Sequence, residues 1–465
     1  RPIVQTHHSY CPTRKSALNM DAKETLNRLE GDGIEHLWVI YHDYSGRSSA
    51  KIVPKESFAS VLERGMVFAQ ANLDATMEDR PTPGAIFGAS SGDFFAVPDP
   101  ASYAPIPYRQ ATARMHAFMF NEDGTVWEGC PRTRLQSMVD AYASEGLGIR
   151  VGFEPEFYLF KPGQNSEYYP ADADGIAAVA GLDRHHSLWK SILDNLNKMG
   201  VKVSQLGKEG GPGQYEATTH YAEPLKAVDD YLTFKEVSRA LAREVGCIAS
   251  FMPKPYTHLY SCGLHLHLSL WDTAGQRDLS MGQSADELLS PLGRYFVGGL
   301  LAHSRALTGV AAPIVNSYKR LLPGSWAPAH ICWGLRNRAA LVRIPGMGSR
   351  RRIEFRSGDN AANPFIFLTA VLASGLDGIK KEIEPPPPVV DDVGQLSDQE
   401  AEACGLELLP RSLPAALDAF EADQVLEEAL GEVITLEFLR VKRGELASYD
   451  LHVHPWERKL YLEAI

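Results

Sequence analysis

Four parts of the chain carry residue types that could do chemistry, and the first is an acid pair. In the segment Gly-Phe-Glu-Pro-Glu-Phe-Tyr-Leu-Phe (152–160), Glu154 and Glu156 are two residues apart, so on a β-strand both side chains project from one face. Neighbouring carboxylates repel each other unless a cation or a shared proton holds them. An acid pair on a strand is more often a solvated face than a metal site, so the other parts must decide.

The second and third parts add oxygen and imidazole ligands. Glu209 and Glu216 are separated by a turn rich in Gly and Pro that could fold both carboxylates inward, although an ordinary loop is the simpler interpretation of this turn alone. His265, His267 and Ser269 alternate with leucines, so they share one strand face. Carboxylates with a single imidazole suit Mg²⁺ or Mn²⁺ better than Zn²⁺.

The fourth part is basic, in the C-terminal half of an otherwise acidic chain. Its arginines include Arg320, Arg336, Arg338, Arg343 and those of 350–356. On a strand, Arg352, Glu354 and Arg356 face one way, either as a structural ion-pair row or as a site for a nucleotide polyphosphate or a carboxylate. The chain has neither GxxxxGK[ST] nor GxGxxG after a predicted strand, so metal ions and arginines would have to bind any phosphates.

These residues lie on a predicted alternation of strands and long helices. Strands are expected at 34–41, toward Val53, and at 149–160, 200–206, 214–219, 263–271, 340–345 and 352–356. Helices are expected at 20–28, 56–64, 132–146, 182–199, 223–246, 284–307, 361–378 and 427–440. The pattern predicts an α+β protein built on a mostly antiparallel sheet with flanking helices.

Length and composition limit the organisation and the partners. The 465 residues predict a polar tail (1–20), a small α+β domain (21–120) and a larger domain (121–465). The net charge of −12 argues against nucleic acid and against an anionic membrane surface as the main partner. The six cysteines include no CxxC pair, which predicts free thiols in a reducing cytosol. The sequence has no run of about 18 apolar residues that would indicate a membrane span. A cytoplasmic location is therefore expected.

Taken together and in this order, the four parts resemble the motifs of the glutamine synthetase family. The resemblance runs from Asp-Tyr-Ser-Gly-Arg (43–47) to His-Pro-Trp-Glu (454–457), nearly the whole chain. It implies an N-terminal β-grasp domain, a catalytic domain, and a homo-oligomer, expected to be a stacked-ring dodecamer with active sites between subunits. It also implies that ATP converts the side-chain carboxylate of glutamate to an acyl phosphate, which an amine attacks.

The resemblance implies roles for individual residues. Two or three Mg²⁺ or Mn²⁺ ions are implied, one held by Glu156, Glu209 and Glu216 and another by Glu154, His265 and Glu354. Nucleotide contacts are implied for His267, Ser269, Arg338, Arg343 and Arg352, glutamate contacts for Arg320 and Arg356, and a place near the site for Asp99. Catalytic roles are expected for Arg338, Arg356 and Trp326, and substrate contacts also for Tyr260, Ser261 and Trp326.

The chain departs from the family pattern where ammonia would bind. Family members typically read Pro-Gly-x-Glu-Ala-Pro on a loop that closes the site, whereas here Trp326 stands in place of the Glu. The other ammonium-binding acid corresponds to Ala69. Tyr-Ser-Cys-Gly (260–263) replaces Asn-Gly-x-Gly, and Gly207-Lys208 replaces a His pair.

These departures remove two carboxylates and add an indole. Ammonium is small, charged and strongly hydrated, so its site needs anionic groups. The sequence therefore predicts a γ-glutamylamide ligase that uses an organic amine. An aromatic or hydrophobic amine that is already neutral needs no base to release its lone pair. The other candidates are an alkylamine and a polyamine, whose distal ammonium could bind Asp74, Glu78 and Asp79. The alternatives are a glutamine synthetase that uses ammonia and a non-catalytic structural or regulatory family member.

Overall fold

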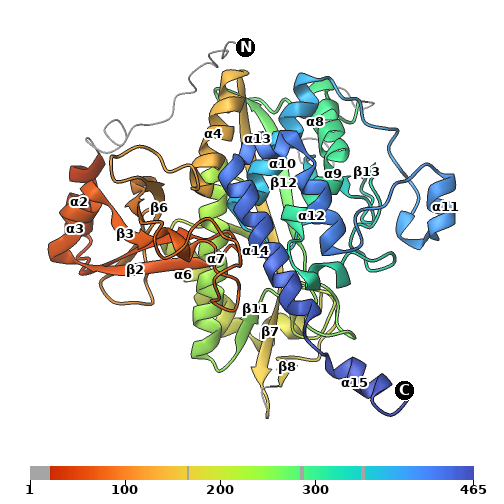
Figure 1. Ribbon diagram of the computed structural model, residues 1–465, viewed down its shortest axis with the longest axis horizontal. Coiled ribbons are helices and arrows are strands. Elements are labelled where there is room, and N and C mark those ends of the chain that lie inside the picture. Colours follow the sequence, from red (N-terminus) through yellow and green to blue (C-terminus); the bar gives the residue numbers. More distant parts are fainter. Residues whose placement is uncertain (1–20, 165–166, 283–286, 347–350) are drawn as a thin grey trace.

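The computed structural model describes residues 21–164, 167–282, 287–346 and 351–465. Two sheets organise these residues, a smaller N-terminal one and a larger one in the middle of the molecule (Figure 1). The predicted tail (1–20) lies outside the described residues. The predicted division into domains of 21–120 and 121–465 stays a prediction, although all strands of the smaller sheet lie before residue 121.

The smaller sheet has six strands in the order β2-β1-β6-β4-β3, with β5 paired to β6. Its strands are β1 (His36–His42), β2 (Ser48–Pro54), β3 (Met66–Ala69), β4 (Asp93–Pro98), β5 (Ala104–Pro105) and β6 (Thr112–Phe120). The helices before β1 and β3 are α2 (Asp21–Gly31) and α3 (Phe58–Arg64). β1 pairs antiparallel with β2 and parallel with β6, so it lies between them inside this sheet, and β6 is the central strand.

The larger sheet has nine strands in the order β13-β14-β15-β12-β7-β10-β9, with β8 and β11 paired to β7. They are β7 (Leu147–Pro162), β8 (Tyr168–Pro170), β9 (Val203–Lys208), β10 (Gln214–Thr219), β11 (Ile248–Ser250), β12 (Leu264–Asp272), β13 (Trp333–Leu335), β14 (Val342–Ile344) and β15 (Ile353–Phe355). Only the β13–β14 pair is parallel among the described strands of this sheet. The predicted α+β class with a mostly antiparallel sheet is confirmed.

Helices cover this sheet and form much of the core. They are α4 (Pro131–Ser144), α5 (Val179–Arg184), α6 (His186–Lys198), α7 (Pro224–Glu244), α8 (Pro291–Ala302), α9 (Ser304–Ala311), α10 (Pro364–Lys380), α11 (Asp398–Ala403), α12 (Leu413–Glu421), α13 (Gln424–Leu430), α14 (Glu432–Asp450) and α15 (Pro455–Tyr461). α10 is apolar nearly all round and is buried against α4, α8 and α13, as expected for a helix inside a large core.

Three local differences from the sequence prediction have physical causes. The helix expected at 284–307 begins at Pro291, and it is interrupted at His303, so α8 and α9 are separate; residues 284–286 lie outside the described residues. The helix expected at 427–440 is divided at Gly431, whose φ of +81° is outside the helical region. β6 was not predicted as a strand, because Arg114 and His116 interrupt its apolar pattern.

Among the helices of the described residues, none combines the length and the apolar character that crossing a lipid bilayer requires.

Candidate active site

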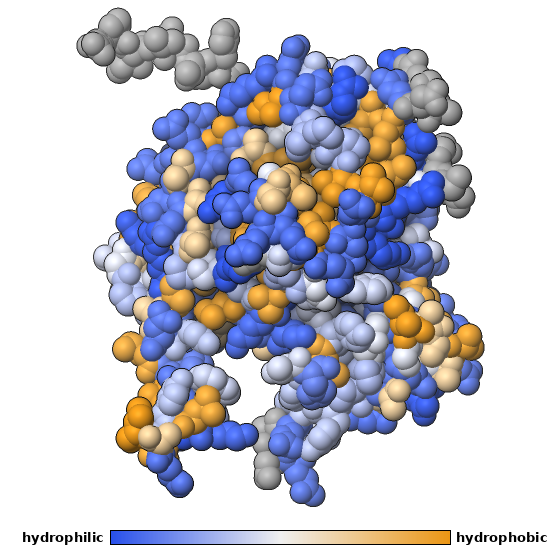
Figure 2. Space-filling model, turned by 90° about the vertical axis from the view of Figure 1, so that its right-hand side faces the viewer, coloured by the Kyte–Doolittle hydropathy of each residue, from blue (hydrophilic) through white to orange (hydrophobic). Residues whose placement is uncertain are grey.

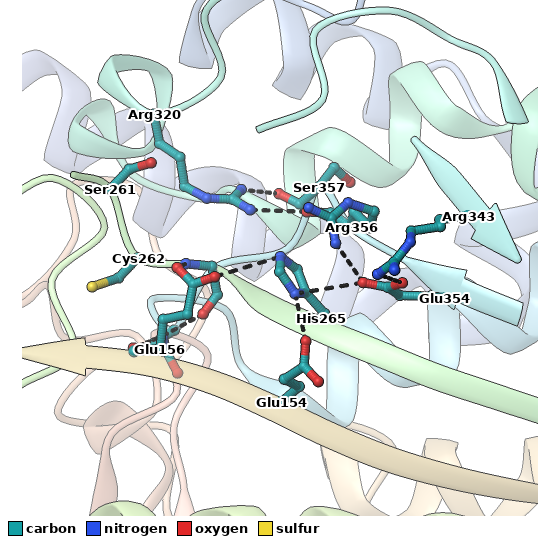
Figure 3. Close-up of polar contacts among 12 residues, drawn as sticks. Glu154, Glu156, Ser261, Cys262, His265, Arg320, Arg343, Glu354, Arg356 and Ser357 are labelled. Carbon is teal, nitrogen blue, oxygen red and sulfur yellow. Dashed lines mark hydrogen bonds and ion pairs between the residues drawn. The ribbon is translucent and has the colours of Figure 1, made fainter. Parts of the chain in front are cut away.

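The register of the larger sheet brings the acidic and histidine residues together. β12 lies between β7 and β15, so His265 is paired with Glu154 and His267 with Glu354. On the other side of β7, Glu216 of β10 is paired with Glu156. Because residues paired across a sheet project from the same face, the sequence motifs converge on one site near the centre of the sheet (Figure 3).

Glu154 is the centre of this cluster. Its Oε1 lies 3.1 Å from His265 Nδ1, and its Oε2 lies 3.1 Å from His267 Nε2 and accepts a hydrogen bond of 3.0 Å from Thr218 Oγ1. Burial raises the pKa of Glu154, but the hydrogen bonds from the two imidazoles outweigh burial and hold the pKa well below its usual range. Glu154 is therefore ionised at neutral pH.

Glu354 is fully buried and is neutralised by arginines. It forms ion pairs with Arg356 and, at 2.9 Å, with Arg343. Burial raises the pKa of Glu354, but Arg356 and the neighbouring cations lower it to about 2. The Nε atoms of Arg343 and Arg356 are buried and have no hydrogen-bond partner among the described residues.

The opposite side of the site holds three crowded carboxylates, those of Glu156, Glu209 and Glu216. Glu156 Oε2 accepts a hydrogen bond of 2.8 Å from the Gly263 amide, and Oε1 lies 3.9 Å from His265 Nε2. Burial and the neighbouring acids raise the pKa of Glu209, and they raise that of Glu216 to about 9. These carboxylates therefore cannot all ionise together unless a cation is bound.

The donor set fits a hard divalent cation. Two groups offer ligand atoms within 4.8 Å of one another: Glu154, His267 and Glu354 form one, and Glu154, Glu216 and His265 form the other. The groups differ from the expected sets, because His267 rather than His265 joins Glu354, and Glu216 joins Glu154 rather than Glu156. Carboxylates with one imidazole in each group suit Mg²⁺ or Mn²⁺.

The predicted nucleotide contacts are distributed over a longer surface. Arg352 Nε donates to His267 Nδ1 at 2.9 Å, so a neutral His267 carries its proton on Nε2 and directs it at Glu154. Ser269 lies further along β12, where its hydroxyl accepts a hydrogen bond of 2.8 Å from Trp271 Nε1. Arg343 lies in the cluster, whereas Arg338 is exposed beside it.

Arg320 is buried beside the cluster and binds backbone. Its guanidinium donates to the carbonyls of Ser357 and Arg356, both at 2.9 Å, as Figure 3 shows. A side chain at Gly263 would place its Cβ 2.7 Å from Arg320 Nη2 and 2.7 Å from His265 Nε2. Only glycine fits between these two groups. The donors of Arg320 that remain would be the ones to contact a ligand.

A cavity of about 350 Å³ lies between the loop of Trp326 and the segment after the four prolines (385–388). Its lining includes Trp326, Leu335, Arg336, Arg338, Val390 and Asp392. Trp326 is 67% exposed and has a φ of +63°, an unusual conformation for a bulky residue. Arg338 lines this cavity, and its charge opposes the upward shift that burial causes in the pKa of Glu209.

Tyr260 and Ser261 lie next to the turn that carries Glu209. The exposed Tyr260 ring faces Gly210 and Gly211, close enough that a Cβ on either glycine would touch it. The Ser261 carbonyl accepts a hydrogen bond of 2.9 Å from Gln214 Nε2.

The acids expected near the amine, and Asp99, which was expected near the site, form other contacts in the structure. Asp74 is buried, and burial together with Glu437 raises its pKa to about 8. Asp79 pairs with Arg47, and Glu78 with Arg80. Asp99 pairs with Arg132 at 2.5 Å, and Ala69 is exposed at the end of β3. The structure places none of these described residues in the two metal-ligand groups.

Sequence reasoning missed two residues that hold the cluster. Thr218 donates to Glu154, and its signal was its position two residues after Glu216 on the same strand face. Asn360 Nδ2 donates to the carbonyls of Glu156 and Gly263, both at 3.0 Å. Asn360 comes from the turn before α10, where no sequence pattern signals a contact with β7.

Comparison with known proteins identifies the architecture. Residues 128–461 match the family described as glutamine synthetase, catalytic domain. The chain is 35% identical over 414 residues to a glutamine synthetase of Thermococcus kodakarensis, covering 89% of each chain. It is 32% identical over 456 residues to a glutamine synthetase of Halobacterium salinarum, covering 96% of this chain and 98% of the relative.

Solved structures extend the comparison to a neighbouring branch. A complex of GmaS (γ-glutamylmethylamide synthetase) with ADP superimposes with a TM-score of 0.85 at 33% identity, covering 94% of this chain and 99% of GmaS. A structure described as a novel glutamine synthase homologue gives a TM-score of 0.79 at 29% identity, covering 90% of this chain and 96% of the homologue.

Proposed function

The chain belongs to the glutamine synthetase family of carbon–nitrogen ligases, and we propose that it joins the side-chain carboxylate of L-glutamate to an organic amine, with ATP as co-substrate. The product is a γ-glutamylamide, formed through a γ-glutamyl phosphate. The observation that carries the proposal is Trp326, an exposed indole at the edge of a cavity, where the family pattern has a carboxylate. The likeness to GmaS supports this branch.

We assign the metal ions to the acidic face of the site. The ligands would be Glu154, Glu156, Glu209, Glu216, His265 and Glu354, with His267 close enough to Glu154 and Glu354 to take part. Bound Mg²⁺ or Mn²⁺ neutralises nucleotide phosphates and stabilises charge on the phosphoryl group in transfer. The protein orients these ligands itself: Arg352 fixes the His267 tautomer, and Thr218 directs one oxygen of Glu154.

The arginines would bind the anionic parts of the substrates. Arg343 and Arg356 already neutralise Glu354, and a phosphate or carboxylate oxygen bound beside Glu354 would be attracted by the same two guanidinium groups. Arg338, which lines the cavity, would bind the transferring phosphoryl group. Arg320 and Arg356 would hold the glutamate carboxylates, which fixes the reacting carboxylate near the metal ions.

The cavity would take the amine. Trp326, Leu335 and Val390 supply apolar surface for an alkyl or aromatic group. A protonated amine would find one acid in the lining, Asp392, whose carboxylate also accepts a hydrogen bond of 3.0 Å from the Gly394 amide. One acid beside two arginines, Arg336 and Arg338, favours a neutral aromatic or hydrophobic amine over a polyamine, which would need a second anion.

Phosphate release from ATP, with glutamate and Mg²⁺, tests the proposal across ammonia, methylamine, isopropylamine, ethanolamine, putrescine, spermine and aniline. We expect strong turnover with one organic amine and little with ammonia. Trp326→Ala should raise KM for that amine about tenfold, the effect of losing one good packing contact, while leaving KM for glutamate near the wild-type value. Tyr169→Ala, at an exposed aromatic residue of β8, serves as the control.

Glutamine synthetase activity is the second candidate, because curated relatives along most of the chain carry that name. Best turnover with ammonia, together with an unchanged amine preference in Trp326→Ala, would establish it and remove the γ-glutamylamide assignment. A non-catalytic role is disfavoured because all six proposed metal-ligand positions carry Glu or His. Absence of metal-dependent ATP turnover with every amine would support that role.

A further inference from the structure

We propose that Lys208 and Asp172 form a buried ion pair that holds the turn between β9 and β10, and so positions Glu209 and Glu216 to bind metal. The inference rests on the proposed metal-dependent function. Lys208 is the last residue of β9, directly before Glu209. Its role is that of a positioning residue, since its ammonium touches the turn.

The Lys208 ammonium is surrounded by backbone carbonyls of the turn. It donates to the carbonyl oxygens of Glu209 at 3.3 Å, Gln214 at 3.2 Å, and Gly211. An ammonium group has three donors, and these three carbonyls occupy them. The Lys208 ammonium therefore contacts the backbone at both ends and in the middle of the turn between Glu209 and Glu216.

Asp172 holds the same turn from the other side. Its Oδ1 lies 3.7 Å from the Lys208 Nζ and accepts a hydrogen bond of 2.9 Å from the Gly213 amide. Its Oδ2 accepts a hydrogen bond of 2.8 Å from the Tyr215 hydroxyl. Both charged side chains are 0% exposed, so water cannot replace these contacts.

The surrounding residues are shaped to enclose the Lys208 side chain. The Tyr215 ring lies 5.3 Å from Nζ, within the range of a cation–π contact. A Cβ on Gly181 would lie 2.8 Å from Lys208 Cδ, so glycine is needed for the stem to pass. Gly213 has a φ of +72°, and a Cβ there would lie 2.7 Å from the Leu159 carbonyl. The turn therefore has one shape, with Lys208 at its centre.

This arrangement matters because the proposed ligands repel one another. In the ionised form that binds metal, Glu209 and Glu216 would lower their energy by moving away from Glu154 and Glu156 unless the turn were held. The Lys208–Asp172 pair prevents that movement by bonding the turn's backbone. Mutation of side chains that orient metal ligands commonly lowers metal affinity by about 10–100-fold. Loss of the Lys208–Asp172 pair should therefore lower the affinity for a divalent metal ion.

The experiment titrates metal-stripped protein with Mn²⁺ and counts free Mn²⁺ by electron paramagnetic resonance, without ATP or glutamate. Lys208→Met keeps the length of the side chain and removes its charge and donors. We expect the Mn²⁺ concentration for half-saturation to rise about tenfold or more. Lys202→Met is the matched control, an exposed lysine directly before β9, and should bind Mn²⁺ like the wild type.

A double variant separates positioning from folding. Lys208→Met alone leaves Asp172 buried without its counter-charge, which destabilises proteins; adding Asp172→Asn removes both charges and keeps an acceptor for Gly213. A folded single or double variant with wild-type Mn²⁺ affinity would overturn the proposal, as would failure of both to fold, which would assign the pair to the fold. Weaker Mn²⁺ binding in the folded double variant supports it. A wild-type protein that binds no Mn²⁺ would instead contradict the proposed metal-dependent function.

Discussion

Glu216 is opposed by four other carboxylates in the site, and burial together with these acids raises its pKa from 4.5 to about 9. Between these values the metal-free native protein binds a proton that the unfolded chain has lost, so this group makes stability fall as pH rises. A bound divalent cation would remove the penalty, since it favours the charged form.

Glu216→Gln is therefore expected to act in opposite directions with and without metal. In EDTA at pH 8 the variant should melt a few °C above the wild type, because Gln is neutral in both states, whereas Glu216 must take up a proton on folding. With Mn²⁺ it should gain less than the wild type, because a ligand is gone. Thermal unfolding with and without Mn²⁺ checks both, with the exposed Glu402→Gln as control; a metal-free variant that melts below the wild type would contradict the expectation.

At the residue scale, the sequence predicted the candidate ligand residues better than the residues that position them. The predicted strands that carry Glu154, His265 and Glu354 are confirmed, and alternation by two gives the strand face on which each side chain lies. The same rule could have found Thr218. It could not have found the contact between Lys208 and Asp172, since Asp172 lies in a loop whose position depends on the folded chain. The roles assigned to the site residues stay predictions.

At the scale of elements, His303 joins three helical segments. Its Nδ1 lies 2.7 Å from Asp423, the N-cap of α13, and its Nε2 lies 3.1 Å from Asp377 in α10. Burial lowers the pKa of His303, but the hydrogen bonds to both acids outweigh it, and the net shift is upward from 6.5. The stabilisation is therefore fully present below about pH 6.5 and is lost as pH rises through the higher pKa of the folded state.

His303→Gln should consequently destabilise the protein more at pH 6 than at pH 9. We expect a loss of about 1–2 kcal/mol at pH 6, the size of charged hydrogen bonds after allowance for partial solvent screening, and a smaller loss at pH 9. Urea unfolding at the two pH values measures the change in the free energy of unfolding. The control is His186→Gln, at an exposed position of α6. Equal losses at both pH values would show that His303 acts without its charge.

The elements that sequence reasoning missed are those fixed by distant partners. The apolar run through α8 and α9 predicted one helix, and the interruption at His303 follows from acids in α10 and α13. β6 escaped prediction because Arg114 and His116 look like surface residues. Both are buried, with Glu236 and Asp229 of α7 as partners. Local periodicity cannot reveal a charge that a remote element neutralises.

At the scale of the whole molecule, the C-terminal end is the part that packs least on the rest. α15 lies apart from the body in Figure 1, and apolar residues (orange) lie on the segment that projects at the lower left of Figure 2. Exposed apolar side chains of this end are Leu451, Val453, Trp456, Leu460, Tyr461, Leu462 and Ile465. A monomer rarely leaves so many apolar groups together in water, so a second copy of the chain is the expected partner.

Deletion of residues 452–465 should therefore reduce the size of the assembly. Each apolar side chain buried between subunits contributes about 1.5–3 kcal/mol, so losing six should dissociate contacts built on α15 while each subunit keeps its core. Light scattering after size exclusion measures the mass, and circular dichroism checks that helices persist. Trp456→Ser with Leu460→Ser should reproduce the effect, whereas Lys459→Ser on the same helix should not. A truncated chain with the wild-type mass would mean that subunits associate through other surfaces, leaving the exposed residues of this end without a role in assembly.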